Sequence, residues 1–271
     1  LTQTSVCIIS NICPRCKEAL AYGNPLVTIY LMYVLKLYVT FSSMDKIAIS
    51  SAKGGVGKTT TTYLLAKKFT YDGYKVGIFD ADIYGPNIFN MFKVDINDVK
   101  KSDGSNIFEP VVVENIQISS VELVLRNNEP AIWRGPMLSK VLIGLYNKVN
   151  WTDVDVLLFD MPPGTGDAYI TVFNDLKVEK SILVCGDDSL SIEDTKKTVL
   201  FLNKYKISIL GVIENMSENF SFGEDIINSK SLSANLNDIP VIGTVPRLTK
   251  KEIYNNCLNS NKIYAYLPNF N

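Results

Sequence analysis

One short stretch of this sequence has the residue types and spacing needed to hold a phosphate group. Residues 51–60 read Ser-Ala-Lys-Gly-Gly-Val-Gly-Lys-Thr-Thr. The glycines let consecutive backbone N–H groups turn inward, and a following helix would add its N-terminal partial positive charge. Lys58 would reach the β- and γ-phosphates, and the Thr59 hydroxyl would ligate Mg²⁺. A flexible glycine turn is the alternative, but it leaves the Lys-Thr pair unexplained. The stretch predicts a nucleoside triphosphate site at Gly54, Gly55, Val56, Gly57, Lys58, Thr59 and Thr60.

Three aspartates follow short apolar runs and could act on a bound phosphate. Asp160 follows Val-Leu-Leu-Phe and precedes a restricted Pro-Pro-Gly-Thr-Gly loop, as expected of a carboxylate that orders Mg²⁺ and its waters. Asp80 and Asp82 follow a second run, and the chain contains no histidine. Asp82 is therefore the natural group to orient an attacking water, while Asp80 would assist at the metal. A helix N-cap is the alternative for both. The predicted Mg²⁺ ligands, direct or through water, are Thr59, Asp80 and Asp160.

Short apolar runs alternate with helical patterns from residue 44 onward, which predicts an α/β fold. The expected architecture is a doubly wound, mostly parallel β-sheet with helices on both faces. We expect residues 93–115 to be irregular, and Ser189 or Ser191 to cap a helix. The expected strands are 46–50, 75–79, 116–121, 155–159, 181–185, 208–213 and 241–243, and the expected helices are 60–71, 136–149 and 189–205.

The composition is that of an ordinary globular protein. Of the 271 residues, 46% are hydrophobic and 20% charged, and the formal net charge is −1. Near-neutral charge gives no support for a nucleic-acid surface, so no nucleic-acid partner is expected. The absence of histidine excludes histidine-based acid–base catalysis and histidine metal ligands. The five cysteines form no disulfide framework, which favours a reducing, cytoplasmic location.

The first 43 residues differ in character from the rest. Residues 25–41 are almost uninterruptedly apolar, at the lower edge of what could span a bilayer. We interpret residues 1–43 as a leader of doubtful status: either an upstream extension before Met44, which we favour, or a membrane anchor. The Cys13–Cys16 pair within it is ascribed to chance. Residues 44–271 are expected to form a single ATPase domain.

Five motifs in order resemble a known family. Lys-Gly-Gly-Val-Gly-Lys-Thr-Thr resembles the deviant Walker A motif of the MinD/ParA group of P-loop ATPases. The other four resemble the Mrp/ApbC branch of that group, whose members are implicated in carrying iron–sulfur clusters. These four are Asp-Ala-Asp-Ile-Tyr-Gly-Pro-Asn (80–87), Trp-Arg-Gly-Pro-Met (133–137), Asp-Met-Pro-Pro-Gly-Thr-Gly-Asp (160–167) and Glu-Asn-Met-Ser (214–217).

The resemblance implies a slow, dimer-dependent ATPase that uses ATP and Mg²⁺. Two subunits of a homodimer would face each other across two ATP molecules, and Lys53 would reach the partner's phosphates, as an arginine finger does. Lys53 thereby joins the ATP-binding residues and joins Lys58 and Asp82 as a catalytic residue. Asn215 matches the residue that reads adenine. Iron–sulfur client or scaffold proteins are the implied partners, and a membrane would be involved only if the leader is real.

One feature of the resembled branch is missing. Its members usually carry a Cys-x-x-Cys pair after Glu-Asn-Met-Ser, which supplies thiolates to a bridging [4Fe–4S] cluster. Ser221 and Glu224 stand there in this chain. The usual cluster site is therefore absent, and whether a [4Fe–4S] cluster is bound stays open. The alternative function is a MinD/ParA-like switch for spatial organisation on membrane or DNA. The tail at 253–260 lacks the basic amphipathic pattern expected of a MinD-like membrane helix.

Overall fold

In the part of the chain that the structure describes, eight strands form one sheet that positions the predicted site. In the computed structural model, the described residues are 44–96, 99, 107–125, 135–186, 188–217, 236, 239–255, 264 and 267–268. Among them the strands are β1 (Asp45–Ser50), β2 (Val76–Asp80), β3 (Val111–Val113), β4 (Ile116–Ser120), β5 (Val156–Asp160), β6 (Lys180–Cys185), β7 (Ser208–Ser217) and β8 (Val241–Pro246).

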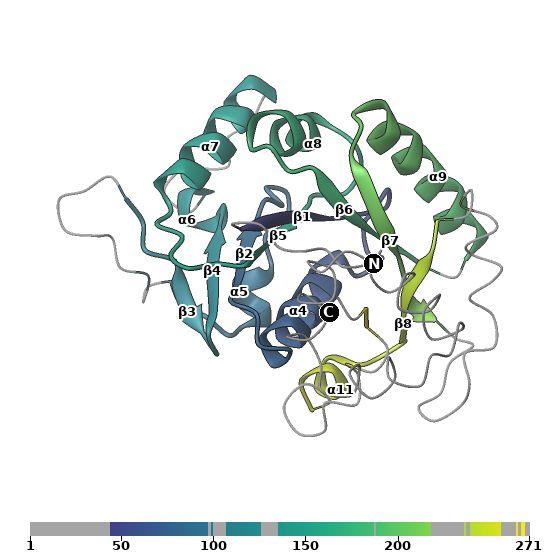
Figure 1. Cartoon of the computed structure of the whole chain (residues 1–271), viewed down its shortest axis with the longest axis horizontal. Coiled ribbons are helices and arrows are strands. Elements are labelled where there is room, and N and C mark those ends of the chain that lie inside the picture. The colour runs from purple at the N-terminus through teal and green to yellow at the C-terminus, as the bar shows by residue number, and fades with distance from the viewer. Residues whose placement is uncertain are drawn as a thin grey trace, which may run out of the picture. The chain divides into compact units, whose positions relative to one another are not determined.

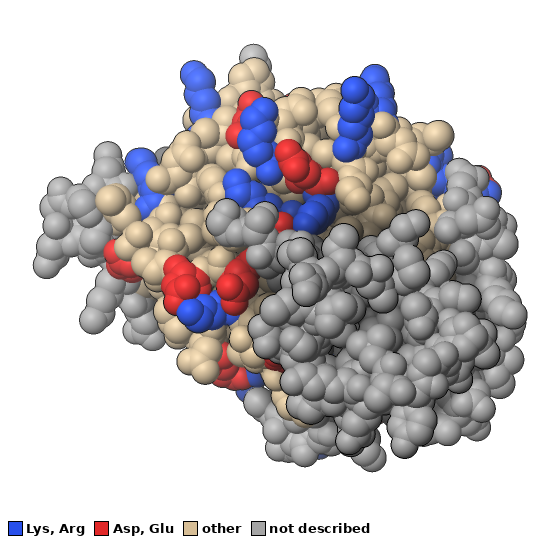
Figure 2. All heavy atoms as spheres, in the orientation of Figure 1, with Lys and Arg blue, Asp and Glu red and all other residues tan. Residues whose placement is uncertain are grey.

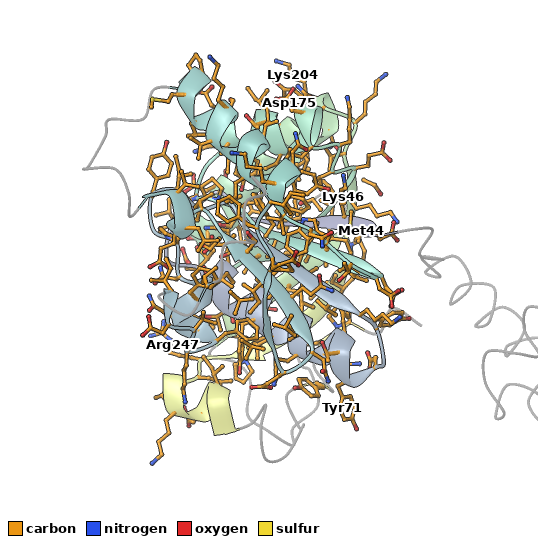
Figure 3. All side chains as sticks on the ribbon, turned by 90° about the vertical axis from the view of Figure 1, so that its left-hand side faces the viewer. Met44, Lys46, Tyr71, Asp175, Lys204 and Arg247 are labelled. Atoms are coloured by element: carbon orange, nitrogen blue, oxygen red, sulfur yellow. The ribbon has the colours of Figure 1, made fainter. Side chains whose placement is uncertain are left out.

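Helices connect most of these strands. They are α4 (Lys58–Tyr71), α5 (Ile88–Met91), α6 (Glu122–Leu125), α7 (Gly135–Lys148), α8 (Asp167–Ile170), the π-helix η2 (Thr171–Asp175), α9 (Ser189–Lys204) and α11 (Lys250–Asn255). Helices α4 and α5 cover one face of the sheet, and α7, α8 and α9 cover the other (Figure 1). The side view in Figure 3 shows side chains filling the space between the sheet and its helices.

The strand order is β3-β4-β2-β5-β1-β6-β7-β8. All neighbouring strands run parallel except β3, which pairs antiparallel with β4 at one edge. From β1 the chain moves first toward β2 on one side and later toward β6 on the other, so the strand order reverses around β1. Ligands of such sheets bind outside the carboxyl ends of the strands at this reversal. The α/β, doubly wound and mostly parallel fold is confirmed.

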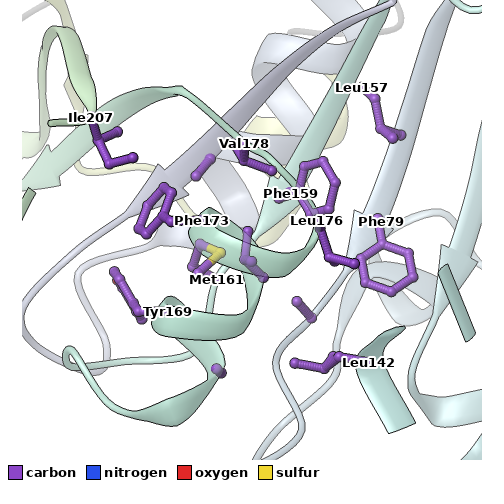
Figure 4. Close-up of a cluster of buried hydrophobic side chains, with 14 of the residues drawn as sticks. Phe79, Leu142, Leu157, Phe159, Met161, Tyr169, Phe173, Leu176, Val178 and Ile207 are labelled. Atoms are coloured by element: carbon purple, nitrogen blue, oxygen red, sulfur yellow. The ribbon is translucent and has the colours of Figure 1, made fainter. Parts of the chain in front are cut away.

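The central strands are buried because their sequences are almost wholly apolar. Every residue of β2 and β5 is buried, as expected for parallel strands covered on both faces. Both strands end in aspartate, and pairing brings Asp80 directly opposite Asp160. Buried Phe79, Phe159 and Met161 belong to one large apolar cluster, which also contains residues of α7, α8 and η2 (Figure 4).

The structure corrects several expected boundaries. Residues 93–115 are not irregular throughout, since three consecutive valines form β3 by pairing with β4. Helix α4 begins at Lys58, two residues before its expected start, because Gly57 adopts the left-handed conformation and supplies the turn into the helix. Strand β7 continues to Ser217 instead of ending at 213, because β8 pairs along this extension.

The cap of α9 was also assigned wrongly. Asp188 is its N-cap, and the Asp188 side chain accepts a hydrogen bond of 2.9 Å from the backbone N–H of Ser191. The Ser191 hydroxyl donates to the same carboxylate, so the serine is a donor to the cap and Ser189 is already the first helical residue. An aspartate carboxylate accepts from the exposed N–H groups of a first turn, which explains its preference here.

Candidate functional site

The loop between β1 and α4 has the conformation that a phosphate cradle needs. Gly55 and Gly57 have φ angles of 82° and 87°, in the left-handed region that side chains disfavour. At Gly57 a second constraint applies, since a Cβ there would overlap the carboxamide nitrogen of Asn215. The residues at 53–55 are exposed, while Val56 and Lys58 are buried beneath them. The loop leads directly into the N-terminus of the 14-residue helix α4. The free backbone N–H groups of a helix N-terminus favour a bound anion, so the loop and the helix together suit a phosphate.

Lys58 lies inside the site, close to two of the predicted carboxylates. Its Nζ donates a hydrogen bond of 2.9 Å to the Oγ of Ser51. Burial lowers the Lys58 pKa, and the negative charges of Asp160 and Asp82 partly offset that effect. The structure thus brings together the lysine from the loop, a carboxylate from β5 and a carboxylate from the segment after β2. These three residues were predicted to act together.

Asp160 has one carboxylate oxygen that the described residues leave without a hydrogen bond. Its Oδ1 accepts from the Thr62 hydroxyl at 2.9 Å, whereas its Oδ2 is fully buried and has no partner among the residues the structure describes. Burial raises the Asp160 pKa to about 6, against the lowering effect of the nearby Thr59 and Thr62 hydroxyls and of Lys58. A buried, unsatisfied carboxylate oxygen beside Thr59 fits a site for a hydrated cation.

Asp80 and Asp82 differ in their surroundings. The Asp80 carboxylate accepts hydrogen bonds from the backbone N–H groups of Asp82 (3.1 Å) and Ile88 (3.2 Å) and from the Ser120 hydroxyl (3.1 Å). Burial, followed by the charge of Asp160, raises its pKa well above the ordinary value. These contacts favour a role in holding the segment that carries Asp82. The predicted role of Asp80 at the metal stays a prediction.

Asp82 is half-buried and uses one oxygen to order its own turn. Its Oδ1 accepts hydrogen bonds from the backbone N–H groups of Tyr84 (3.0 Å) and Gly85 (3.2 Å). Burial raises the Asp82 pKa, and these two hydrogen bonds and the charge of Lys58 lower it. The bonds fix the direction of the carboxylate, which suits a group that must orient a water molecule. Its catalytic role stays a prediction.

Asn215 connects the far strand β7 to the phosphate loop. It is 4% exposed, and its Nδ2 donates a hydrogen bond of 2.8 Å to the carbonyl of Val56. The residue therefore supports the loop from beneath, a role that the sequence did not reveal. The predicted reading of adenine by Asn215 stays a prediction.

Lys53 is exposed at the outer side of the loop. Its backbone carbonyl accepts a hydrogen bond of 2.8 Å from the Ser51 hydroxyl. Hydrogen bonds from Ser191 lower the pKa of Asp188, and the positive charge of Lys53 adds a smaller lowering effect. An exposed, positively charged side chain at this edge suits a residue that acts beyond its own subunit.

The glycine-rich segment after β5 lies directly against the phosphate loop. The N–H of Gly164 donates to the Ser51 carbonyl at 3.3 Å, and a Cβ on Gly54 would stand 3.8 Å from the Cβ of Pro163. Two residues in this region were missed by the sequence analysis. Thr62 binds Asp160, and Tyr169 donates its hydroxyl to the Ser51 carbonyl at 3.1 Å. Burial raises the Tyr169 pKa, so this hydroxyl stays protonated.

A sequence signal exists for one of these two residues. Thr62 stands three residues after Thr59, hence on the same side of α4, so helical spacing alone points it toward the same carboxylate. Tyr169 has no such signal, because its contact joins residues 118 positions apart. The predictions for Ser221 and Glu224, for the leader and for the motif residues 133–134 concern residues outside those that the structure describes.

Two features of the surroundings bear on metals and membranes. Within the described part of the chain, no group of three or more cysteine or acidic residues could hold a metal ion. Mg²⁺ is usually bound by one or two carboxylates together with phosphate oxygens and water, so the predicted residues could hold it without such a group. No helix among the described residues is both long and apolar enough to cross a membrane. On the face shown in Figure 2, the described lysines and arginines lie among described acidic residues and form no continuous basic patch with one another.

A phosphate loop between β1 and α4, a carboxylate at the end of β5 and a glycine-rich loop beside both define a P-loop NTPase. Comparison with known proteins specifies the family. Residues 42–262 match the ParA family model, described as NUBPL iron-transfer P-loop NTPase. The chain belongs to this family.

Two curated relatives share the name iron-sulfur cluster carrier protein. The chain is 37% identical over 200 residues to the iron-sulfur cluster carrier protein of Rickettsia felis, covering 74% of this chain and 60% of the relative. It is 37% identical over 171 residues to the iron-sulfur cluster carrier protein of Escherichia coli, covering 63% of this chain and 46% of the relative. The chain thus spans about half to three fifths of the length of these relatives.

Solved structures show the same fold. A nucleotide-binding protein from Archaeoglobus fulgidus in complex with ADP matches with a TM-score of 0.59 and 29% identity, covering 83% of this chain and 90% of that one. The septum site-determining protein MinD from Pyrococcus horikoshii, complexed with Mg-ADP, matches with a TM-score of 0.58 and 24% identity, covering 82% and 92%. The second likeness concerns the fold alone.

Proposed function

We propose that this protein is an ATP-binding and ATP-hydrolysing P-loop protein of the iron–sulfur cluster carrier type, acting as a homodimer in the cytoplasm. The observation that carries the proposal is the convergence of Lys58, Asp82 and Asp160 beside the phosphate loop. Family membership and the names of the curated relatives support the carrier assignment.

The residues around the loop fit Mg²⁺–ATP. The loop's backbone and the N-terminus of α4 would hold the phosphates, and Lys58 would exchange its hydrogen bond to Ser51 for the β- and γ-phosphate oxygens. Thr59 and Asp160 would hold Mg²⁺, directly or through water, with the unsatisfied Oδ2 of Asp160 as an acceptor for a metal-bound water. When bound, Mg²⁺ neutralises charge between the β- and γ-phosphates.

Hydrolysis would then depend on orienting water and stabilising charge. Asp82 would hold a water in line with the γ-phosphorus. The water oxygen would form a bond to the γ-phosphorus while the bond between the γ-phosphorus and the β,γ-bridging oxygen breaks. The products are ADP, which keeps the bridging oxygen, and phosphate. Lys58 and the partner subunit's copy of Lys53 would stabilise the charge that develops on the transferred group. We assign ATP in preference to GTP because Asn215, held at the loop through Val56, matches the adenine-reading position of the family.

The carrier part of the proposal leaves the cluster ligands open. Cys185, the one cysteine among the described residues, is fully buried and donates its thiol to the Gly186 carbonyl at 3.1 Å. It is therefore unsuited to bind a cluster at the surface. The position of the family's usual cysteine pair is occupied by Ser221 and Glu224, which are poor cluster ligands. A cluster would be cargo transferred to client or scaffold proteins.

Phosphate release at several protein concentrations tests the ATPase part. Hydrolysis per chain should rise with concentration, because Lys53 acts on the partner's nucleotide. Lys53→Ala and Asp82→Asn should each reduce the rate at least tenfold, whereas Lys197→Ala, at an exposed lysine of α9, should leave it unchanged. Rates equal to those of the parent would remove the two catalytic assignments.

Iron and sulfide analysis after anaerobic reconstitution tests the carrier part. Bound iron and sulfide are the result that cluster carrying predicts, and absorbance from thiolate-to-iron charge transfer would show that cysteines supply the ligands. Normal ATPase activity without bound iron or sulfide would remove cluster carrying from the proposal and leave the nucleotide chemistry in place.

A further inference from the structure

Ser51, the first residue after β1, is the point where several parts of the site meet. Its hydroxyl accepts a hydrogen bond from Lys58 Nζ (2.9 Å) and donates one to the Lys53 carbonyl (2.8 Å). Its backbone N–H and carbonyl are hydrogen-bonded to the segment that follows β5. One residue is thus bonded to both lysines of the phosphate loop through its side chain, and to a different part of the chain through its backbone.

The backbone partner of Ser51 is the hydroxyl of Tyr169. That hydroxyl accepts from the Ser51 N–H at 3.2 Å and donates to the Ser51 carbonyl at 3.1 Å. Tyr169 is fully buried, and its ring lies 5.8 Å from Phe173 and 5.9 Å from Phe201, measured between ring centroids. Figure 4 shows Tyr169 and Phe173 together on one side of the apolar cluster. The packed ring leaves the hydroxyl little freedom to seek another partner.

Tyr169 is also attached to the glycine-rich loop at 161–166. Its own N–H donates to the carbonyl of Gly166 at 2.9 Å, at the end of that loop. From within the loop, the Gly164 N–H donates to the Ser51 carbonyl at 3.3 Å. The loop is therefore connected to Ser51 twice: directly through Gly164, and from its end through Tyr169.

We propose that Tyr169 is a positioning residue that couples the loop at 161–166 to Lys58 and Lys53 through Ser51. A γ-phosphate that shifts the loop moves Tyr169, which moves the Ser51 backbone and with it the hydroxyl bonded to the lysines. The coupling also acts in reverse through the same hydrogen bonds. When Lys58 leaves Ser51 for a phosphate, the preferred conformation of the loop at 161–166 changes. This inference rests on the proposed ATP site and assigns it a residue outside the recognised motifs.

Tyr169→Phe removes the coupling hydroxyl and keeps the packed ring. The test measures dissociation constants for ADP and for a non-hydrolysable ATP analogue, both with Mg²⁺, on the full chain. A purely structural role would weaken both ligands equally. Coupling through the hydroxyl predicts that the ratio of the ADP constant to the analogue constant falls about fivefold or more in the variant. Tyr205→Phe is the matched control, because the Tyr205 ring packs against Phe201 in the same aromatic group.

The outcomes separate this inference from the proposed function. A parent protein that binds neither ligand contradicts the proposed function itself. Equal affinities of the parent for ADP and the ATP analogue overturn the coupling. The coupling is also overturned if Tyr169→Phe, like Tyr205→Phe, keeps the parent's ratio of dissociation constants. If Tyr169→Phe does not fold, amide hydrogen exchange of the parent decides: the segment 50–53 should exchange differently with the ATP analogue and with ADP. Equal exchange with both ligands also overturns the proposal.

Discussion

Replacing Asp160 by asparagine should stabilise the nucleotide-free protein at neutral pH while removing its function. In the folded chain, burial raises the Asp160 pKa from 3.8 to about 6, so folding disfavours the ionised carboxylate. Below the unfolded pKa the carboxyl is neutral in both states and carries no penalty. The destabilisation caused by the ionised carboxylate grows as the pH rises from the unfolded pKa of 3.8 to the folded pKa of about 6. Above pH 6 it reaches about 3 kcal/mol. Asparagine has no charge to desolvate, and its carbonyl oxygen can still accept from Thr62.

Urea denaturation of parent and Asp160→Asn, both without nucleotide or Mg²⁺, measures this difference. At pH 7.5 the variant should unfold with a free energy larger by up to about 3 kcal/mol, and at pH 5 about half of that gain should remain. Asp175→Asn, at an exposed aspartate of η2, should change stability by less than about 0.5 kcal/mol. A variant no more stable than the parent at pH 7.5 would refute the reasoning that the buried carboxylate awaits a cation.

Three further substitutions test separate parts of the site. Gly57→Ala should weaken ATP binding more than tenfold, because φ is 87° and the new Cβ overlaps Asn215, whereas Gly144→Ala, where the Cβ meets open space, should leave binding unchanged. Equal affinities of Gly57→Ala and the parent in an ATP titration would contradict this prediction. Thr62→Val should raise the Mg²⁺ concentration for half-maximal hydrolysis severalfold, because Asp160 loses its hydrogen bond, whereas Thr62→Ser, which keeps the hydroxyl, should have the parent's value. An unchanged Mg²⁺ dependence in the valine variant would argue against this role of Thr62. Asn215→Ala should reduce the preference for ATP over GTP, measured by competition, and a retained preference would exclude Asn215 as the adenine reader.

The sequence predicted the fold and the phosphate loop because both depend on local patterns. Fully apolar runs such as Val-Leu-Leu-Phe indicate strands buried on both faces, and the spacing of glycines and Lys58 indicates a cradle. The carboxylates at the ends of β2 and β5 were also found, since parallel strands bring their carboxyl ends to one edge.

Contacts between distant residues could not be predicted in the same way. The Tyr169 hydroxyl meets Ser51 across 118 positions, and the Asn215 carboxamide meets Val56 across 159. The metal role predicted for Asp80 stays a prediction, whereas the hydrogen bonds of Asp80 could not be predicted at all. Its residue type and position suit a metal ligand, but its hydrogen bonds to Ile88 and Ser120 become visible only when the chain is folded.

The central claim, that the loop before α4 binds Mg²⁺–ATP through Lys58, is tested most directly by equilibrium titration with a fluorescent ATP analogue. The parent should bind the analogue saturably and with stronger affinity in the presence of Mg²⁺. Lys58→Ala should weaken binding at least a hundredfold, since Lys58 is the buried cation of the site. Absence of saturable binding by the parent, or equal affinities for parent and variant, would contradict the account.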